Sequence, residues 1–306
     1  TMTFKQFSGI VELRTKIVSM STLFASTAYT SWRIGRLDVV SFLLLLFAAL
    51  AVDMGTTGFN TYFDFLGGVD HPEHNRERSK VLVHEGVRPK AALTVSVLCF
   101  GIAVVLGLVI ALRSGWPVIL AGGASMAVGF FYTGGPLPIS RTPLGEIFAG
   151  GFLGTVFFLI VYYVLGGSVD PRSLFHAFLA SLPSALFIAS ILTTNNTCDI
   201  EGDKAAGRRT LSILIGRRAA AALIYVEGIL GFALAAAWVV AGILPIPVLL
   251  ALGAAAGLSV FVYRRMGALG YSHETKQNAM GGISQVFILY SAAIFLGLVF
   301  ESVRIW

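Results

Sequence analysis

The stretch VVSFLLLLFAALAVDMGTTGFN, residues 39–60, is long and apolar enough to cross a lipid bilayer as one helix. About 20 residues at ~1.5 Å each cover the ~30 Å of hydrocarbon in a bilayer. The chain continues as TYFDFLGGVD, residues 61–70, so that Asn60, Asp64 and Asp70 stand where the apolar run meets water. Any proposed function has to account for an amide and two carboxylates at the boundary between hydrocarbon and water.

Composition places the whole chain in a membrane. Of its 306 residues, 56% are hydrophobic and 12% are charged, and the mean hydropathy is +0.81. Soluble globular domains carry about 25% charged residues. We therefore predict an all-α, polytopic membrane protein with nine transmembrane helices, formed by the apolar stretches at residues 17–33, 39–60, 91–112, 116–133, 145–167, 173–194, 218–240, 243–263 and 281–300.

The distribution of basic residues predicts the orientation. Only five of the 22 Lys and Arg residues lie on the side that would hold the C-terminus, and the rest lie at the N-terminus and in the even-numbered loops. Because cytoplasmic loops carry an excess of Lys and Arg, we expect an integral protein of the cell (inner) membrane with its N-terminus and long polar loops in the cytoplasm and its C-terminus opposite. The net charge of +6 reflects this bias, and nothing suggests a nucleic-acid partner.

Two polar loops open with an amide and carboxylates spaced by four residues. The first polar loop follows Asn60 and runs through FDFLGGVDHPEHNRERSKVLVHEGVRPK, residues 63–90; the second is NNTCDIEGDKAAGRRTLSILIGRR, residues 195–218. Side chains four apart on one helix are neighbours, about 5 to 6 Å apart at Cβ. The residues at this spacing are Asn60 and Asp64 in the first case and Asn195, Asp199 and Asp203 in the second.

Oxygen ligands at this spacing suit a hard divalent cation, and we predict Mg²⁺. This ion gains much of its hold from substrate phosphates, so the predicted ligand is phosphorylated. The Gly67–Gly68 pair is expected to end the first helix and to return Asp70 toward the same site. The predicted metal ligands are Asn60, Asp64, Asp70, Asn195, Asp199 and Asp203.

Basic residues follow each acidic group and are placed to bind phosphate oxygens that a metal leaves open. Since both loops are predicted on one side of the membrane, we expect them to face each other and to cap a central cavity between the helices. The plainer interpretation is that the acids are solvated helix caps and that the bases only set the topology. The repeated spacing favours a site. The basic residues are Arg76, Arg78 and Lys80 in the first loop and Lys204, Arg208 and Arg209 in the second.

Other titratable residues are left with open roles. Asp53 lies on the same helix face as Asn60, and Glu227 is a second acid inside an apolar stretch. Each either serves the site or makes an inter-helix hydrogen bond. The histidines lack metal-like spacing; they are His71, His74, His84, His176 and His273.

The two motifs together resemble those of the UbiA superfamily of intramembrane prenyltransferases. The shared pattern is N-xxx-D with a following Asp in the first loop and N-N-xx-D-xxx-D-xxx-G-R-R-T-L in the second. A third segment, YTGGPLPISRTPLGE at residues 132–146, is similar to a signature of the 1,4-dihydroxy-2-naphthoate branch, in menaquinone biosynthesis. The resemblance covers essentially residues 1–306, expected to form one domain. The chain departs from the pattern at Thr61 and Gly68, and Asp70 is expected to replace an acid missing at Gly68.

The resemblance implies transfer of a polyprenyl group from its diphosphate to an aromatic acceptor, in the naphthoate branch with loss of CO₂. About two Mg²⁺ ions would bridge the diphosphate to the predicted ligands, of which Asp64, Asp199 and Asp203 are central. Tyr132 is expected to stabilise an allylic cation, the alternative being a tyrosine of the membrane interface. The implied diphosphate-binding residues are Asn60, Lys80, Arg141, Asn195, Arg208 and Arg209.

The lipid bilayer is itself an expected partner. A long prenyl tail stays in hydrocarbon, while its diphosphate reaches the cytoplasmic surface, which explains acids at the boundary. Other acceptors remain open, namely hydroxybenzoate, homogentisate or a glycerol phosphate lipid. An anion transporter is a further alternative, but transporter sites lie near the midplane on broken helices, whereas these acids lie at one face.

Overall fold

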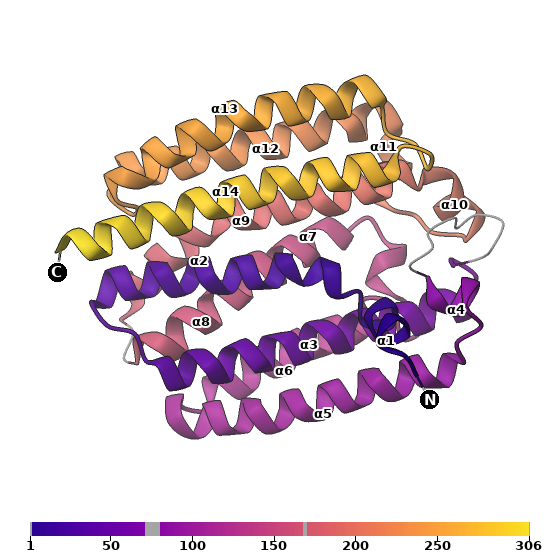
Figure 1. Ribbon diagram of the computed structural model, residues 1–306, viewed down its shortest axis with the longest axis horizontal. Coiled ribbons are helices and arrows are strands. Elements are labelled where there is room, and N and C mark those ends of the chain that lie inside the picture. Colours follow the sequence, from indigo (N-terminus) through magenta and orange to yellow (C-terminus); the bar gives the residue numbers. More distant parts are fainter. Residues whose placement is uncertain (1, 71–79, 168–169, 306) are drawn as a thin grey trace. The chain divides into compact units, whose positions relative to one another are not determined.

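Helices form all of the regular structure in residues 2–70, 80–167 and 170–305, which are the residues that the computed structural model describes (Figure 1). The predicted all-α class is therefore confirmed. The longer helices are α2 (Ile17–Ile34), α3 (Val39–Leu66), α5 (Pro89–Ser114), α6 (Pro117–Phe131), α8 (Phe157–Gly166), α9 (Pro171–Cys198), α12 (Arg217–Val240), α13 (Ile246–Leu269) and α14 (Lys276–Ile305). The shorter elements are α1 (Phe4–Val11), η1 (Leu13–Lys16), α4 (Val81–His84), η2 (Ile139–Arg141), α7 (Gly145–Ala149), the π-helical η3 (Gly150–Val156), α10 (Ile200–Ala205) and α11 (Leu211–Ile215).

Seven helical segments are long and apolar enough to cross a membrane, within the described part of the chain. The other two predicted stretches also form helices, but each lacks one property of a span. At 15 residues α6 is about 22 Å long, short of the ~30 Å of hydrocarbon, and α2 is rich in Ser and Thr. The seven are Val39–Leu66, Pro89–Ser114, Gly145–Gly166, Pro171–Cys198, Arg217–Val240, Ile246–Leu269 and Lys276–Arg304.

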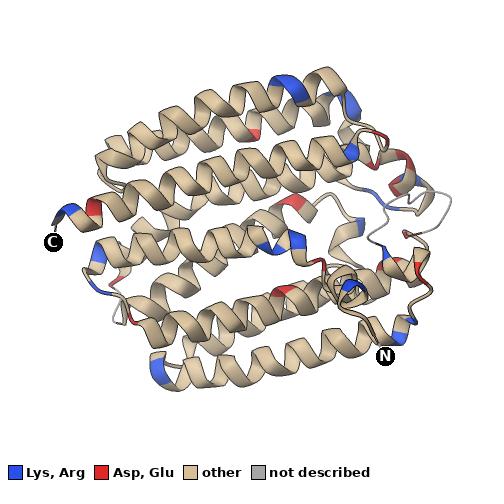
Figure 2. Cartoon of the chain, in the orientation of Figure 1, with Lys and Arg blue, Asp and Glu red and all other residues tan. Residues whose placement is uncertain are grey.

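The surfaces of these helices fit an apolar surrounding. Large apolar side chains in the middle of the helices, such as Val105 on α5 and Leu258 on α13, are 61% and 54% exposed. Charged residues gather near the helix ends (Figure 2). Burying a charge in hydrocarbon is costly, so this distribution is that of helices whose middle sections contact lipid.

The chain forms two compact units, of which the first comprises residues 1–20, 43–145 and 201–210. Here α1 packs against α4 and α5 through a buried apolar cluster. Phe59 on α3 makes edge-to-face contacts with Phe100 and Phe130, with ring centroids 5.0 and 5.2 Å apart. These contacts fix the end of α3, which carries the first motif. The cluster comprises Ile10, Val11, Val81, Leu82, Ala92, Val95 and Cys99.

The second unit comprises residues 21–42, 146–200 and 211–306. Within it α9 packs against η3, α12 and α14. Gly154 lies so close to α9 that an added Cβ would stand 2.5 Å from the Ala185 Cα. At the other end of α9, the Asp170 carboxylate accepts hydrogen bonds from the backbone N–H groups of Arg172 and Ser173, which caps the helix. The helix with the second motif is therefore fixed by close packing.

Candidate functional site

The end of α3 brings the first motif together. The helix stops at Leu66, and Gly68 adopts a left-handed φ of 71° that a glycine takes without strain. The backbone N–H of Asp70 then donates to the Asp64 carbonyl at 3.1 Å. The prediction that the glycine pair ends the helix is confirmed, and the backbone of Asp70 turns back to Asp64.

Arg208 joins the two polar loops. Its Nη2 lies 2.6 Å from Asp64 Oδ1 and its Nη1 lies 3.1 Å from Asp203 Oδ1, and the three side chains are at most 18% exposed. Burial disfavours the charge on Arg208, but the two carboxylates outweigh burial and raise the pKa of Arg208 above its ordinary value. The first unit thus gathers two acids from distant parts of the chain on one guanidinium.

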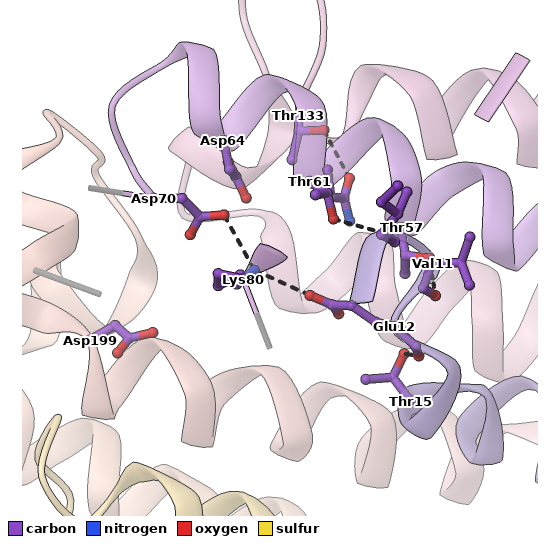
Figure 3. Close-up of polar contacts among 12 residues, drawn as sticks. Val11, Glu12, Thr15, Thr57, Thr61, Asp64, Asp70, Lys80, Thr133 and Asp199 are labelled. Atoms are coloured by element: carbon purple, nitrogen blue, oxygen red, sulfur yellow. Dashed lines mark hydrogen bonds and ion pairs between the residues drawn. The ribbon is translucent and has the colours of Figure 1, made fainter. Parts of the chain in front are cut away.

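Lys80 pairs with Asp70, the second acid of the first motif, and with Glu12. Its Nζ lies 3.4 Å from Asp70 Oδ2 and 3.1 Å from Glu12 Oε1 (Figure 3). The Asp64 carboxylate is drawn beside the Asp70–Lys80 pair in the same view. Asp70 is buried and Lys80 is mostly buried, so this ion pair is shielded from solvent.

The segment at residues 132–146 contacts both polar loops through the side chain and the backbone of Arg141. The Arg141 guanidinium donates to the carbonyls of Gly67 and Ala206 at 3.4 Å each, and the Arg141 carbonyl accepts from the N–H of Arg209 at 3.0 Å. The Arg209 side chain itself is exposed. Arg141 therefore contacts both the first and the second polar loop.

Tyr132 and Asn60 lie at neighbouring positions of the same unit. Tyr132 is half-buried at the end of α6, and its carbonyl accepts from the Ser140 N–H. The next residue, Thr133, donates its hydroxyl proton to the Asn60 Oδ1 at 2.8 Å. Thr133 was not singled out in the sequence, since it carries no charge and lies in the middle of the signature segment.

Asn195 lies in the last turn of α9 and Asp199 directly follows this helix, both in the second unit. The backbone leaves the helical conformation at Asp199, so the four-residue spacing is helical from Asn195 to Asp199 and not beyond. The expectation that one helix presents all three residues is wrong for Asp203. Asp203 lies instead with Arg208 in the first unit.

Asp199 has two basic partners that the sequence did not assign. Its Oδ2 lies 2.5 Å from Lys276 Nζ, and its Oδ1 lies 3.2 Å from His273 Nδ1. Both come from the start of α14 and the turn before it. In the sequence, His273 lacks metal-like spacing, and the short polar segment SHETK, residues 272–276, is the signal that could have indicated both residues.

The acids inside the apolar stretches make local contacts. Asp53 accepts from Lys16 and from the Ser19 hydroxyl, and Glu227 accepts from the Thr193 hydroxyl at 3.0 Å. Each therefore has the inter-helix partner that was one of its two expected roles. The predicted basic residues Arg76 and Arg78, with His71 and His74, lie outside the described residues.

The oxygen donors fit a hard cation. In the described residues no three His, Cys, Asp and Glu side chains lie close enough to form a metal site by themselves. Two carboxylates nevertheless converge on one positive group, the Arg208 guanidinium, which stands where a cation is favoured. Carboxylate oxygens of this kind are the ligands that Mg²⁺ prefers, and it usually completes its shell with water and phosphate.

Comparison with known proteins identifies relatives of this chain. A 1,4-dihydroxy-2-naphthoate octaprenyltransferase from Bacillus subtilis (strain 168) is 39% identical over 205 residues, which are 67% of this chain and 63% of the relative. The match therefore spans less than two thirds of that relative's length.

Solved structures share the fold at low sequence identity. The apo structure of a UbiA homolog from Aeropyrum pernix K1 has a TM-score of 0.69 at 18% identity, covering 92% of this chain and 98% of that one. A UbiA homolog from Archaeoglobus fulgidus bound to DMAPP and Mg²⁺ has a TM-score of 0.64 at 15% identity, covering 95% and 99%. The UbiA prenyltransferase family matches residues 18–280. With most of its length matched, this chain belongs to the UbiA prenyltransferase family.

Proposed function

We propose that the protein transfers a polyprenyl group from a polyprenyl diphosphate to 1,4-dihydroxy-2-naphthoate, with loss of CO₂, in menaquinone biosynthesis. The observation that carries the proposal is the convergence of Asp64 and Asp203 on Arg208. The choice of acceptor is supported by the Bacillus relative and by the signature segment at residues 132–146.

The reaction is proposed to depend on Mg²⁺. The residues that would hold it are those predicted above, with Asp64, Asp70 and Asp203 in the first unit and Asp199 in the second. When bound, the ion would neutralise diphosphate charge and act as a Lewis acid on the leaving group. The Archaeoglobus homolog bound to DMAPP and Mg²⁺ supports a dependence on Mg²⁺.

The basic residues bind the diphosphate. A planar guanidinium makes two parallel hydrogen bonds to an anion, so Arg141 and Arg208 suit phosphate oxygens, with Lys80 and Arg209 adding charge. Arg208 has to exchange part of its hydrogen bonding with Asp64 and Asp203 for phosphate oxygens when the substrate enters. This exchange couples substrate binding to release of the carboxylates.

The chemistry requires a dry, electron-rich surrounding for the reacting carbon. The allylic C–O bond breaks and both electrons leave with the diphosphate. The ring carbon that carries the carboxyl group attacks the allylic cation, and CO₂ leaves so that the electrons of its bond restore the ring. Tyr132 is proposed as the aromatic wall, because aromatic faces stabilise cations by ~0.5 to 2 kcal/mol.

The membrane arrangement completes the proposal. We propose that α2 and α6 also cross the membrane, to give nine crossings in one domain around a central cavity. The N-terminus and both polar loops would lie in the cytoplasm and the C-terminus on the other side. The prenyl tail would then stay in lipid while its diphosphate reaches the acids at the helix ends.

The test is a transfer assay with membranes that contain the protein. We expect dihydroxynaphthoate and a polyprenyl diphosphate to be consumed only with Mg²⁺, with one CO₂ released per product. Asp64→Ala and Asp199→Ala should each abolish transfer. Unchanged rates would refute the site, and a preference for hydroxybenzoate, homogentisate or a glycerol phosphate, measured by mass spectrometry, would refute the acceptor.

A further inference from the structure

Glu12 lies outside both motifs and yet reaches the candidate site. It follows α1 with φ of 48° and ψ of 58°, and within the described chain it is the only residue other than glycine with a positive φ. Such a conformation is uncommon for residues with a side chain and persists only where the surroundings fix it. The contacts around Glu12 therefore show which interactions fix its backbone in this conformation.

Hydroxyl groups of α3 fasten the segment that carries Glu12. The Thr61 hydroxyl donates to the Ile10 carbonyl at 2.9 Å, and the Thr57 hydroxyl donates to the Val11 carbonyl at 2.7 Å (Figure 3). Thr57, Thr61 and Asp64 follow one another at the spacing of a single helix face. The end of α1 is thus fixed along the face of α3 that presents Asp64.

The Glu12 carboxylate is connected to the candidate site by its ion pair with Lys80. Glu12 Oε1 lies 3.1 Å from Lys80 Nζ, which lies 3.4 Å from Asp70 Oδ2. The ammonium is therefore shared between an acid of the N-terminal segment and a predicted metal ligand. Without Glu12, the full positive charge of Lys80 would turn toward Asp70 and compete with a metal ion there.

We propose that Glu12 is a positioning residue that shares the Lys80 ammonium with Asp70, and thereby keeps Asp70 available to Mg²⁺ and Lys80 directed at the diphosphate. The inference rests on the proposed function. Glu12 is also an anion near an anionic substrate, but its side chain is 31% exposed, so solvent screens that repulsion. The direct contact with Lys80 is screened less, and positioning should therefore outweigh repulsion.

The test measures binding of inorganic pyrophosphate with Mg²⁺ to the purified protein by calorimetry, together with KM for each substrate. We expect Glu12→Gln to weaken pyrophosphate binding about fivefold to tenfold and to raise the donor KM similarly, with the acceptor KM unchanged; this is about 1 to 1.4 kcal/mol. Glu12→Asp should recover part of the affinity. Equal or tighter binding by Glu12→Gln would overturn the proposal.

Two further variants separate positioning from backbone effects. Glu12→Gly relieves the left-handed backbone and should raise the Tm while still losing affinity, whereas wild-type affinity would mean that the carboxylate has no role. In a Lys80→Met background, Glu12→Gln should change binding less than about twofold, because residues that act through one partner are not additive. A full loss in that background would overturn the assignment.

Glu85→Gln is the matched control, since Glu85 is an acid of the same unit that pairs with the exposed Lys5 at 2.5 Å. It should leave binding unchanged. Asp64→Ala, run in parallel, distinguishes the two proposals: if it abolishes binding while Glu12→Gln does nothing, only the role of Glu12 fails. If neither variant has an effect, the proposed function fails together with the role of Glu12.

Discussion

The two units pair their acidic side chains in different ways. In the first unit one guanidinium serves two acids, with a different nitrogen of Arg208 on Asp64 and on Asp203. In the second unit one acid, Asp199, meets two basic side chains, Lys276 and His273. The first arrangement depends on the planar fork of arginine and the second on the presence of positive charge, so equivalent substitutions should have unequal effects.

Removing Arg208 from the first unit and Lys276 from the second should give the largest difference in stability and transfer rate. Arg208→Ala leaves two mostly buried carboxylates without their shared partner, which should cost about 3 to 5 kcal/mol of stability and lower transfer at least ~10²-fold. Lys276→Ala removes one of two partners from a single acid and leaves His273 beside Asp199, so the loss of stability should be ~1 to 2 kcal/mol. Thermal unfolding and transfer rates measure both, and equal losses would contradict the comparison.

Exchanging arginine and lysine tests geometry apart from charge. Arg208→Lys keeps the charge but removes the fork that reaches two acids, so the donor KM should rise about tenfold or more. Lys276→Arg keeps a cation beside a single acid and should change the donor KM less than about threefold. Steady-state kinetics with both variants would decide, and a tolerant Arg208→Lys would show that the fork is not required.

Adding a methyl group at a closely packed glycine should also destabilise the two units to different extents. Gly154→Ala places a Cβ 2.5 Å from the Ala185 Cα, and backbone cannot move away easily, so we expect a loss of ~1 to 3 kcal/mol. Gly58→Ala in the first unit would meet the Ser96 hydroxyl at 2.3 Å, a side-chain atom that can rotate. Its cost should be smaller, as measured by Tm in detergent, and the reverse order would show that α3 is packed more rigidly than α9.

The smallest effect is expected at the far end of α9. Hydrogen bonds from the Ser173 side chain and backbone lower the pKa of the Asp170 carboxyl below its ordinary value of 3.8. A carboxyl with a lowered pKa in the folded state stabilises the fold above its unfolded pKa and loses this contribution as pH falls through the folded value. The Tm difference between wild type and Asp170→Asn should thus be constant above about pH 5 and shrink below about pH 4. A difference that grows on acidification would contradict this origin.

Residues with a strong local signal were predicted well from the sequence. Apolar runs of span length identified most helices, and Gly67–Gly68 correctly marked the end of α3. The count of spans was less reliable because α2 and α6 form helices without the length or hydropathy of the others. Hydropathy therefore indicates a helix more securely than it indicates a crossing.

Contacts between distant segments were not visible in the sequence. Nothing near Glu12 predicts that it contacts Lys80, and nothing near Lys16 predicts its bond to Asp53. Such pairs depend on which helix faces meet, and one sequence gives the faces but not the partners. The same limit hid His273 and Lys276, since their role appears only when the start of α14 lies beside the end of α9.

The positions of Asp64 and Asp199 also have a consequence for ion exchange. Asp64 stands in the last turn of α3, and Asp199 directly follows α9, so each acid is at the carboxyl end of its own helix. The carbonyls at such an end act like about half a negative charge, which adds to the carboxylate. Both helix ends therefore attract positive charge continuously, and Arg208 and Lys276 already occupy them. Under the proposed function, a divalent ion would therefore have to compete with these resident cations for the two carboxylates.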